Sequence, residues 1–304
     1  MIQVIEPKDK AHWLELRKQD VTSTEVSALF GVSPYLTGFE LWHSKKNQTE
    51  SSFAENTRMV WGTRLQDAIA QGVAKDNGWQ IRAMTEYVRD TDLRMGSSFD
   101  YQISPDGLLE IKNVDALQFQ KKWIKAEDVL EAPLHIEMQV QHQLAVSGAK
   151  FAYLSALVGG NTVELVRREP DEAVIKAMRL KVEQFWKSIR DNTPPKPDFE
   201  RDAEFVKSLY PDSMAGKTLN VTDPEFDARA KKYADLGEQI KELETARSAA
   251  QARMIVTISN SERVLGNGYT ISYKKTDDKQ VPEKIVPAHV QPGRRTFRLT
   301  MKGE

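Results

Sequence analysis

Residues 98–112 read SFDYQISPDGLLEIK, and this stretch decides the fold of the chain. Two short runs of strand-forming residues flank Ser-Pro-Asp-Gly, which is a strong turn signal. We therefore predict a β-hairpin, with Asp100 before the turn and Glu110-Ile111-Lys112 on the second strand. Because alternate residues of a strand share a face, Glu110 and Lys112 should point the same way while Ile111 turns into the core.

Two carboxylates and one amine from a single hairpin suit metal-dependent hydrolysis. Mg²⁺ prefers carboxylate, carbonyl and water oxygens, so Asp100, Glu110 and the backbone carbonyl of Ile111 are candidate ligands. The Lys112 ammonium can then orient an attacking water or help to deprotonate it. Taken alone, however, an acid-x-Lys pattern also arises from ordinary surface alternation on a strand, so the wider sequence must separate the two interpretations.

Helical and strand patterns alternate through the first two hundred residues, which predicts an α/β domain. Ser23 and Thr24 are candidate caps for the second helix. Helices are expected at 11–17, 25–30, from about 62 onward, 116–125, 135–146 and 170–189. Strands are expected at 87–89, 95–103, 108–112, 151–158 and 162–168.

A proline-rich segment, 192–197, cannot lie inside a helix, and we place a domain boundary there. The expected domains are 1–197 and a C-terminal extension, 198–304. Apolar residues three and four apart between 223 and 258 approach a coiled-coil seam and predict a long helix or helical hairpin. The last forty residues, including 296–299, predict a small, basic, β-rich appendage.

Composition excludes several classes of protein. Hydrophobic residues make up 40% and charged residues 29% of the 304 positions, which is ordinary for a folded chain. Without cysteine there can be no disulfide, thiolate nucleophile or cysteine-based metal site. The glycines form no Walker A loop, so ATP is not expected. No apolar run is long enough for a membrane span and no signal peptide is evident, so we expect a cytoplasmic protein and no membrane partner.

The net charge and the spacing of the histidines give weaker information about partners and metal sites. Lys and Arg number 43 against 44 Asp and Glu, which gives no overall sign of a nucleic-acid partner. The extension from 201 onward is nevertheless basic, which fits either a solvated surface or a phosphate-binding one. The five histidines show no metal-binding spacing, and we expect them at the surface or at interfaces.

Four blocks of sequence together resemble the lambda-type phage exonucleases of the YqaJ-like recombinase family, within the PD-(D/E)xK nucleases. They are RKQDVTSTE at 17–25, WGTRLQD at 61–67, residues 98–112, and QVQ at 139–141. No single block is specific, but their order and joint spacing are. The resemblance implies a restriction-endonuclease-like α/β core, in which helices flank a central mixed sheet.

The resemblance also implies roles for individual residues around the hairpin. Asp100 and Glu110 bind metal, and Lys112 is the catalytic lysine. Gln139, the first glutamine of the QVQ block, lies beside the active site, and Gln141 is a weaker candidate. A polar stripe along one helix face is the alternative interpretation, because Gln139 and Gln143 are four residues apart.

A second group of residues is implied to bind the end of a DNA strand. Arg17 and Thr24 correspond to the family's arginine and hydroxyl at the 5′-phosphate, and Ser23 is a weaker candidate. The planar guanidinium of arginine suits a terminal phosphate, because it can donate two parallel hydrogen bonds.

One position departs from the family pattern. Four residues after Gly62 the family has a metal-binding glutamate, and this chain has Gln66. An amide oxygen can coordinate a metal without carrying charge, so the second metal site should be weaker. Asp67 is turned about 100° away on a helix and should face elsewhere. Gln66 thus fits natural tolerance, a deliberate change made to trap a DNA complex, or a protein that has exchanged cleavage for binding.

The resemblance therefore implies an ATP-independent 5′-to-3′ exonuclease that acts on double-stranded DNA ends in the bacterial host and leaves 3′ overhangs for phage recombination. It implies two Mg²⁺ ions in the intact site, with Mn²⁺ tolerated. It also implies a ring-shaped homotrimer and a phage single-strand annealing protein as partner. The alternatives are a PD-(D/E)xK endonuclease and a catalytically impaired DNA-end-binding protein.

Overall fold

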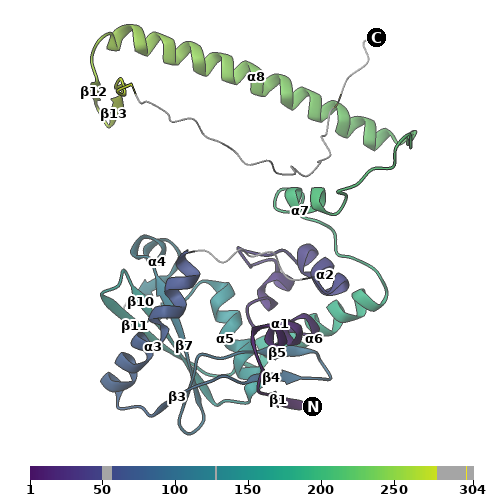
Figure 1. Ribbon diagram of the computed structural model, residues 1–304, viewed down its shortest axis with the longest axis vertical. Helices are drawn as coiled ribbons and strands as arrows, with labels where there is room; N and C mark the ends of the chain where they lie inside the picture. Colours follow the sequence, from purple (N-terminus) through teal and green to yellow (C-terminus); the bar gives the residue numbers. More distant parts are fainter. Residues whose placement is uncertain (50–56, 127–128, 279–298, 300–304) are drawn as a thin grey trace. The chain divides into compact units, whose positions relative to one another are not determined.

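The computed structural model describes residues 1–49, 57–126, 129–278 and 299. The chain divides into two compact units, Met1–Lys207 and Ser208–Glu304 (Figure 1). This division falls later than the boundary expected at 197, because the segment after the prolines packs on the first unit. There Thr37 Oγ1 donates a hydrogen bond to Asp202 Oδ1 at 2.6 Å, and both side chains are buried.

A five-stranded sheet forms the centre of the first unit, in the order β11-β10-β7-β6-β3. Strand β10 runs parallel to β7, and the other neighbouring pairs are antiparallel. The strands are β3 (Ile81–Ala83), β6 (Tyr101–Ile103), β7 (Gly107–Val114), β10 (Phe151–Val158) and β11 (Thr162–Arg168).

Helices cover both faces of this sheet. On one face, Ile69 and Val73 of α3 (Thr57–Asn77) pack against Leu109 and Ile111 of β7. On the other face, the alternate β7 residue Leu108 lies in a cluster with residues of α5 (Leu134–Ser147) and α6 (Glu172–Arg190). This mixed sheet between helices confirms the predicted α/β fold class, with a central sheet flanked by helices.

A smaller sheet contains the N-terminal elements, in the order β1-β4-β5-β2. Its strands are β1 (Ile2–Ile5), β2 (Val21–Thr22), β4 (Tyr87–Asp90) and β5 (Met95–Ser97), and the helices around it are α1 (Lys10–Gln19), the 3-10 helix η1 (Val26–Phe30) and α2 (Gly38–Asn47). β2 runs parallel to β5, with Val21 opposite Met95.

Three local predictions in this region are wrong. The single strand expected at 95–103 is two strands, β5 and β6, because the chain passes from one sheet to the other at residues 98–100. Ser23 and Thr24 do not cap the following helix, because their hydroxyls bond elsewhere and Glu25 occupies the N-cap without a side-chain bond.

The third error concerns residues 116–125, which do not form one helix. Helix α4 ends early (Ala116–Lys122), and the chain continues into β8 (Ile124–Ala126), which pairs with β9 (Val129–Glu131). In contrast, the strands expected at 151–158 and 162–168 coincide with β10 and β11.

The second unit contains one long helix and a hairpin. Helix α8 (Pro224–Ile258) is continuous, begins at the N-cap Asp223, and is preceded by the short α7 (Ala203–Ser208). Strands β12 (Arg263–Gly266) and β13 (Tyr269–Ser272) pair around Gly268. Of the strand expected at 296–299, residues 296–298 lie outside the described residues. Among the helices of the described ranges, none is long and apolar enough to cross a membrane.

His142 contradicts the expectation that the histidines lie at the surface or at interfaces. Its side chain on α5 is completely buried, and its Nε2 lies 3.2 Å from the carbonyl oxygen of Val21. A neutral ring therefore donates one hydrogen bond to the backbone of β2. Burial lowers the pKa of His142 to about 4.

This histidine should make the stability of the protein depend on pH. Its folded pKa lies below the ordinary value of 6.5, so the unfolded chain binds the extra proton first and stability falls as pH drops below 6.5. The contribution lost by pH 4 is about 3 kcal/mol. We expect urea unfolding to show this loss between pH 7 and pH 4, and His142→Gln, which keeps a donor but cannot titrate, to reduce it. Equal pH slopes for parent and variant would contradict the assignment.

Candidate active site

The β6–β7 hairpin brings the predicted acidic residues together. Its antiparallel register, with Tyr101 opposite Leu109, places Asp100 next to Glu110 at the open end of the hairpin. The backbone N–H of Ile111 donates to Asp100 Oδ2 at 2.7 Å, which fixes the orientation of that carboxylate. Glu110 is buried, and it faces away from the α3 cluster that contains Ile111.

Glu110 is the centre of a hydrogen-bonded cluster between β7 and α5. Its Oε1 accepts from Lys112 Nζ and, at 2.6 Å, from Gln139 Nε2, whereas its Oε2 accepts from Gln143 Nε2 at 2.8 Å. Lys112 Nζ also donates to Gln139 Oε1 at 3.1 Å. The hairpin and helix thus bring Asp100, Glu110, Lys112 and Gln139 into one site.

The charges in this site perturb one another because they share a poorly solvated environment. Burial raises the pKa of Asp100, and the neighbouring Glu110 raises it further. Burial disfavours the charged form of Lys112, but Glu110 and Asp100 outweigh that effect and raise its pKa. Lys112 therefore stays an ammonium, and within the described residues it is the cation that contacts Glu110 and acts on Asp100.

Gln66 reaches this site from α3, and its side chain interacts with Asp100 in a way that lowers the pKa of that carboxyl. Asp67 is directed elsewhere, as its position on the helix predicted. Its Oδ1 accepts from Tyr101 Oη at 2.9 Å and from Gln71 Nε2 at 3.3 Å. Within the described part of the chain, no three His, Asp or Glu side chains converge as a metal-binding group.

The donor set of the site nevertheless fits a hard divalent cation. Asp100 and Glu110 contribute carboxylate oxygens, and Gln66 contributes an amide oxygen. Glu110 lies on β7 and Gln66 on α3, whereas Asp100 directly precedes β6. Mg²⁺ prefers such oxygen ligands. A cation beside Asp100 would oppose the two effects that raise its pKa, burial and the neighbouring Glu110 charge.

The second predicted group, Arg17 and Thr24, also comes together. Arg17 Nη2 lies 3.3 Å from Thr24 Oγ1 and 3.5 Å from Thr22 Oγ1, and its guanidinium lies 4.7 Å from the centre of the Trp13 ring. Ser23 takes a different direction. Its buried hydroxyl accepts a 3.0 Å hydrogen bond from Ser97 of β5 and does not join Arg17.

Ser98 connects the two groups of residues. Its Oγ accepts a hydrogen bond from Trp13 Nε1 at 2.8 Å, on the side of Arg17. Its backbone carbonyl accepts from Gln143 Nε2 at 3.4 Å, on the side of Glu110. The Arg17 group and the Glu110 group are therefore parts of one region, joined through a residue only two positions before Asp100.

Sequence reasoning did not nominate three residues of this region, Trp13, Ser98 and Gln143, and it included two that the structure directs elsewhere, Ser23 and Gln141. Trp13 and Ser98 carry no motif that marks their contact, whereas Gln143 could have been nominated from its spacing of four after Gln139. Gln141 points out of the cluster, where its Nε2 donates to the carbonyl of Glu169 at 2.9 Å.

Gln143 holds Glu110 and Ser98 at once, so replacing it should disturb the site without removing a charge. We expect Gln143→Met to lower any metal-dependent DNA cleavage by about tenfold or more, because a misplaced reacting group slows catalysis steeply. The measurement is strand loss from linear duplex, with Gln143→Met introduced into the parent and, separately, into the Gln66→Glu variant. Gln120→Met, on the exposed side of α4, is the matched control. Equal rates for Gln143→Met and the control would contradict this role.

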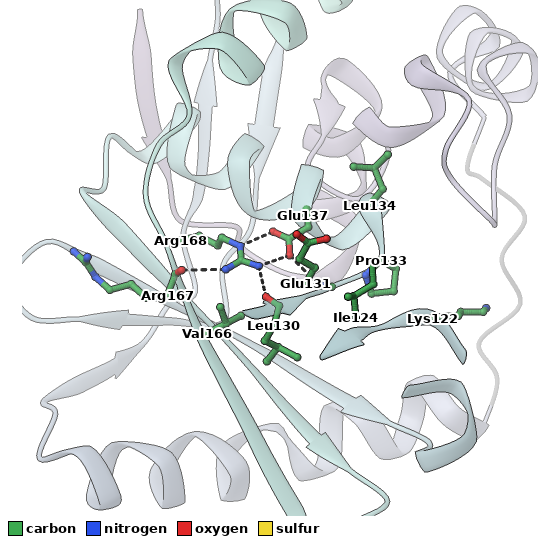
Figure 2. Close-up of a pocket in the computed structure, with 11 residues that line it drawn as sticks. Lys122, Ile124, Leu130, Glu131, Pro133, Leu134, Glu137, Val166, Arg167 and Arg168 are labelled. Carbon is green, nitrogen blue, oxygen red and sulfur yellow. Dashed lines mark hydrogen bonds and ion pairs between the residues drawn. The ribbon is translucent and has the colours of Figure 1, made fainter. Parts of the chain in front are cut away.

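A separate groove of about 740 Å³ lies at the start of α5, beside β8, β9 and β11. Figure 2 shows the Arg168 guanidinium forked onto the Glu137 carboxylate, with two 2.8 Å hydrogen bonds, and also bonded to the Leu130 carbonyl. None of the residues that line it belongs to the predicted site. The groove is therefore distinct from the Glu110 cluster.

Comparison with known proteins identifies the region that carries both groups. Residues 12–150 match the model of the YqaJ-like viral recombinase domain. This match confirms the resemblance predicted from the sequence. All residues of the Glu110 and Arg17 groups fall inside this range.

A relative and two solved structures are similar to the chain over most of their length. The uncharacterized protein YqaJ of Bacillus subtilis strain 168 is 24% identical over 278 residues, which cover 90% of this chain and 85% of the relative. The alkaline exonuclease LHK-Exo from Laribacter hongkongensis is 19% identical, covers 65% of this chain and 100% of its own, and has a TM-score of 0.46. A phage-related exonuclease from Haemophilus somnus 129PT is 12% identical, covers 57% of this chain and 96% of its own, and has a TM-score of 0.42.

Proposed function

We propose that this protein is an ATP-independent, Mg²⁺-dependent exonuclease that degrades the 5′ strand of double-stranded DNA and leaves 3′ overhangs for recombination. The observation that carries the proposal is the convergence of Asp100, Glu110, Lys112 and Gln139 inside the region that matches the YqaJ-like viral recombinase domain. The relatives whose names include exonuclease activity support the same class of reaction.

In this proposal Asp100, Glu110, the Ile111 carbonyl and Gln66 hold the metal. Bound Mg²⁺, or Mn²⁺ in its place, would supply Lewis-acid activation of water and of the scissile phosphate. The intact family site takes two ions, and the uncharged Gln66 should weaken the second. The remaining chemistry belongs to side chains of this chain.

Lys112 is the proposed charge-stabilising group. Its ammonium contacts Glu110 and Gln139, which fix its position, and its positive charge can stabilise charge that develops on a phosphoryl oxygen. Gln139 accepts from Lys112 and donates to Glu110, so it keeps these two residues in register.

Arg17 and Thr24 are the proposed anchor for the 5′-phosphate. A guanidinium and a hydroxyl 3.3 Å apart offer several donors to one terminal phosphate. Their link to Asp100 through Ser98 supports an enzyme that cuts near an anchored end. The ring-shaped homotrimer and the single-strand annealing partner are further parts of the proposal, and they rest on the family resemblance alone.

Digestion of end-labelled duplex tests the proposed function. The parent and Gln66→Glu are given linear duplex with 5′-phosphate or 5′-hydroxyl ends, with Mg²⁺ or Mn²⁺ and without ATP. We expect label on the 5′ strand to be lost first, and loss from 5′-hydroxyl ends to be slower by about tenfold, the effect of a charge-assisted contact.

Two other outcomes would replace this function. Linearisation of circular duplex would identify an endonuclease, because an exonuclease needs an end. Tight binding of DNA ends without cleavage by either protein would identify a DNA-end-binding protein, an outcome for which Gln66 at the acidic position is the specific observation.

A further inference from the structure

We propose that a buried ion pair, Glu25 with Lys45, is a positioning device that fixes Arg17 and Thr24 for a terminal phosphate. The inference deepens the proposed function and rests on it. The pair lies behind the Arg17 group and connects α2 with α1 and with the loop that follows β2. Neither residue belongs to the Glu110 cluster or to the predicted 5′-phosphate contacts.

Lys45 is unusually buried for a lysine, with a side chain only 4% exposed. Its Nζ lies 2.8 Å from Glu25 Oε2, and it donates to the backbone carbonyl of Arg17 at 2.8 Å. The last turn of α1, which carries the Arg17 side chain, is thereby tied to α2.

Glu25 holds the other half of the anchor. Its Oε2 accepts from the backbone N–H of Thr22 at 2.9 Å and from Thr22 Oγ1 at 2.8 Å. Thr22 Oγ1 in turn lies 3.3 Å from Thr24 Oγ1. One ion pair therefore connects the backbone of Arg17 to the loop that carries Thr24, through hydrogen bonds from both of its members.

The electrostatics support positioning as the reason for this pair. Burial opposes the charge of Glu25, but Lys45 and Arg17 outweigh it, so the pKa of Glu25 lies below its ordinary value and the carboxylate stays charged. The Glu25 carboxylate thus attracts the Arg17 guanidinium, and the Thr24 hydroxyl accepts a hydrogen bond from the same guanidinium. A buried ion pair is a poor source of stability, because desolvation offsets much of its attraction, whereas its hydrogen bonds fix geometry.

Binding of DNA ends tests this inference independently of cleavage. Lys112→Ala serves as the background, and the measured quantity is the ratio of dissociation constants for duplex with 5′-hydroxyl and with 5′-phosphate ends. The variants are Glu25→Gln, Lys45→Met and the double variant, with Arg17→Ala as reference. Glu137→Gln, which breaks the half-buried Glu137–Arg168 pair in the groove of Figure 2, is the matched control.

We expect Lys45→Met to lower the end preference by about tenfold, the size of one lost charge-assisted contact. The double variant should regain thermal stability, because no buried charge is left unpaired, but it should not regain the preference. Glu137→Gln should lower stability and leave the preference unchanged. If the end preference is lost while thermal stability is regained, the ion pair positions the phosphate contacts; a purely structural role would change the two together.

Two results would overturn the inference, and they are distinguishable. If Arg17→Ala loses the preference while the double variant keeps it, the phosphate anchor stands and the ion pair does not position it. If the background protein binds both ends equally and Arg17→Ala changes nothing, the proposed 5′-phosphate site itself fails and the inference fails with it.

Discussion

Lys112→Ala is expected to abolish metal-dependent digestion of linear duplex, with a loss of at least about 100-fold, the usual effect of removing one group that stabilises charge in the transition state. Lys112 is the cation that contacts Glu110 and Gln139, and its position on β7 is fixed by the sheet. Because Arg17 and Thr24 are untouched, binding of a 5′-phosphorylated end should change little. The measurement is single-turnover strand loss beside equilibrium end binding.

Lys150→Ala provides the matched control for this variant. Lys150 is an exposed lysine next to β10, and it pairs with Asp106 in the turn at the far end of the same hairpin. Its loss should leave digestion unchanged. Digestion by Lys112→Ala at the rate of the parent would remove the proposed mechanism.

Gln66→Glu is expected to bind Mg²⁺ at least about tenfold more tightly than the parent, because a charged ligand replaces a neutral one. Without metal the variant should be less stable, because a third carboxylate then lies beside Asp100 and Glu110 without a compensating cation. Mg²⁺ should therefore raise the melting temperature of the variant more than that of the parent, and digestion should increase in parallel.

Gln71→Glu tests whether the position or only the added charge matters. Gln71 lies on α3, is exposed, and contacts Asp67 outside the Glu110 cluster. It should not strengthen the response to Mg²⁺. If Gln66→Glu and Gln71→Glu respond alike, Gln66 does not stand at a metal position. If metal binding tightens and no digestion appears, the end-binding alternative is favoured.

The elements predicted best are those whose structure depends on neighbouring residues. Strands β10 and β11 flank a Gly-Gly-Asn turn, so their bounds follow from the sequence. The run at 95–103 looks continuous, yet it belongs to two sheets. Its break depends on the pairing of β5 with β2 and of β6 with β3, which lie in other parts of the sequence, so no local pattern reveals it.

The same distinction applies to the site. Asp100, Glu110 and Lys112 come from one hairpin, so turn chemistry and strand alternation predicted their meeting. The contact of Trp13 with Ser98 joins α1 to a segment more than eighty residues away, and nothing in either neighbourhood marks it. Ser23 and Thr24 were misread as caps, because short hydroxyl side chains bond their neighbours in many contexts.

The placement of Ser98 has a consequence for insertions and deletions. Ser98 bonds to α1 and α5, and Asp100 follows two positions later at the start of the hairpin. A single inserted residue between them would either pull Ser98 from its partners or shift the pairing of Tyr101 with Leu109. The turn at 159–161 is held less tightly: the Gly159 N–H donates to the Val114 carbonyl at 2.8 Å, whereas Gly160 adopts a positive φ in open surroundings. Length variation among relatives should therefore collect at that turn and be absent from 98–100.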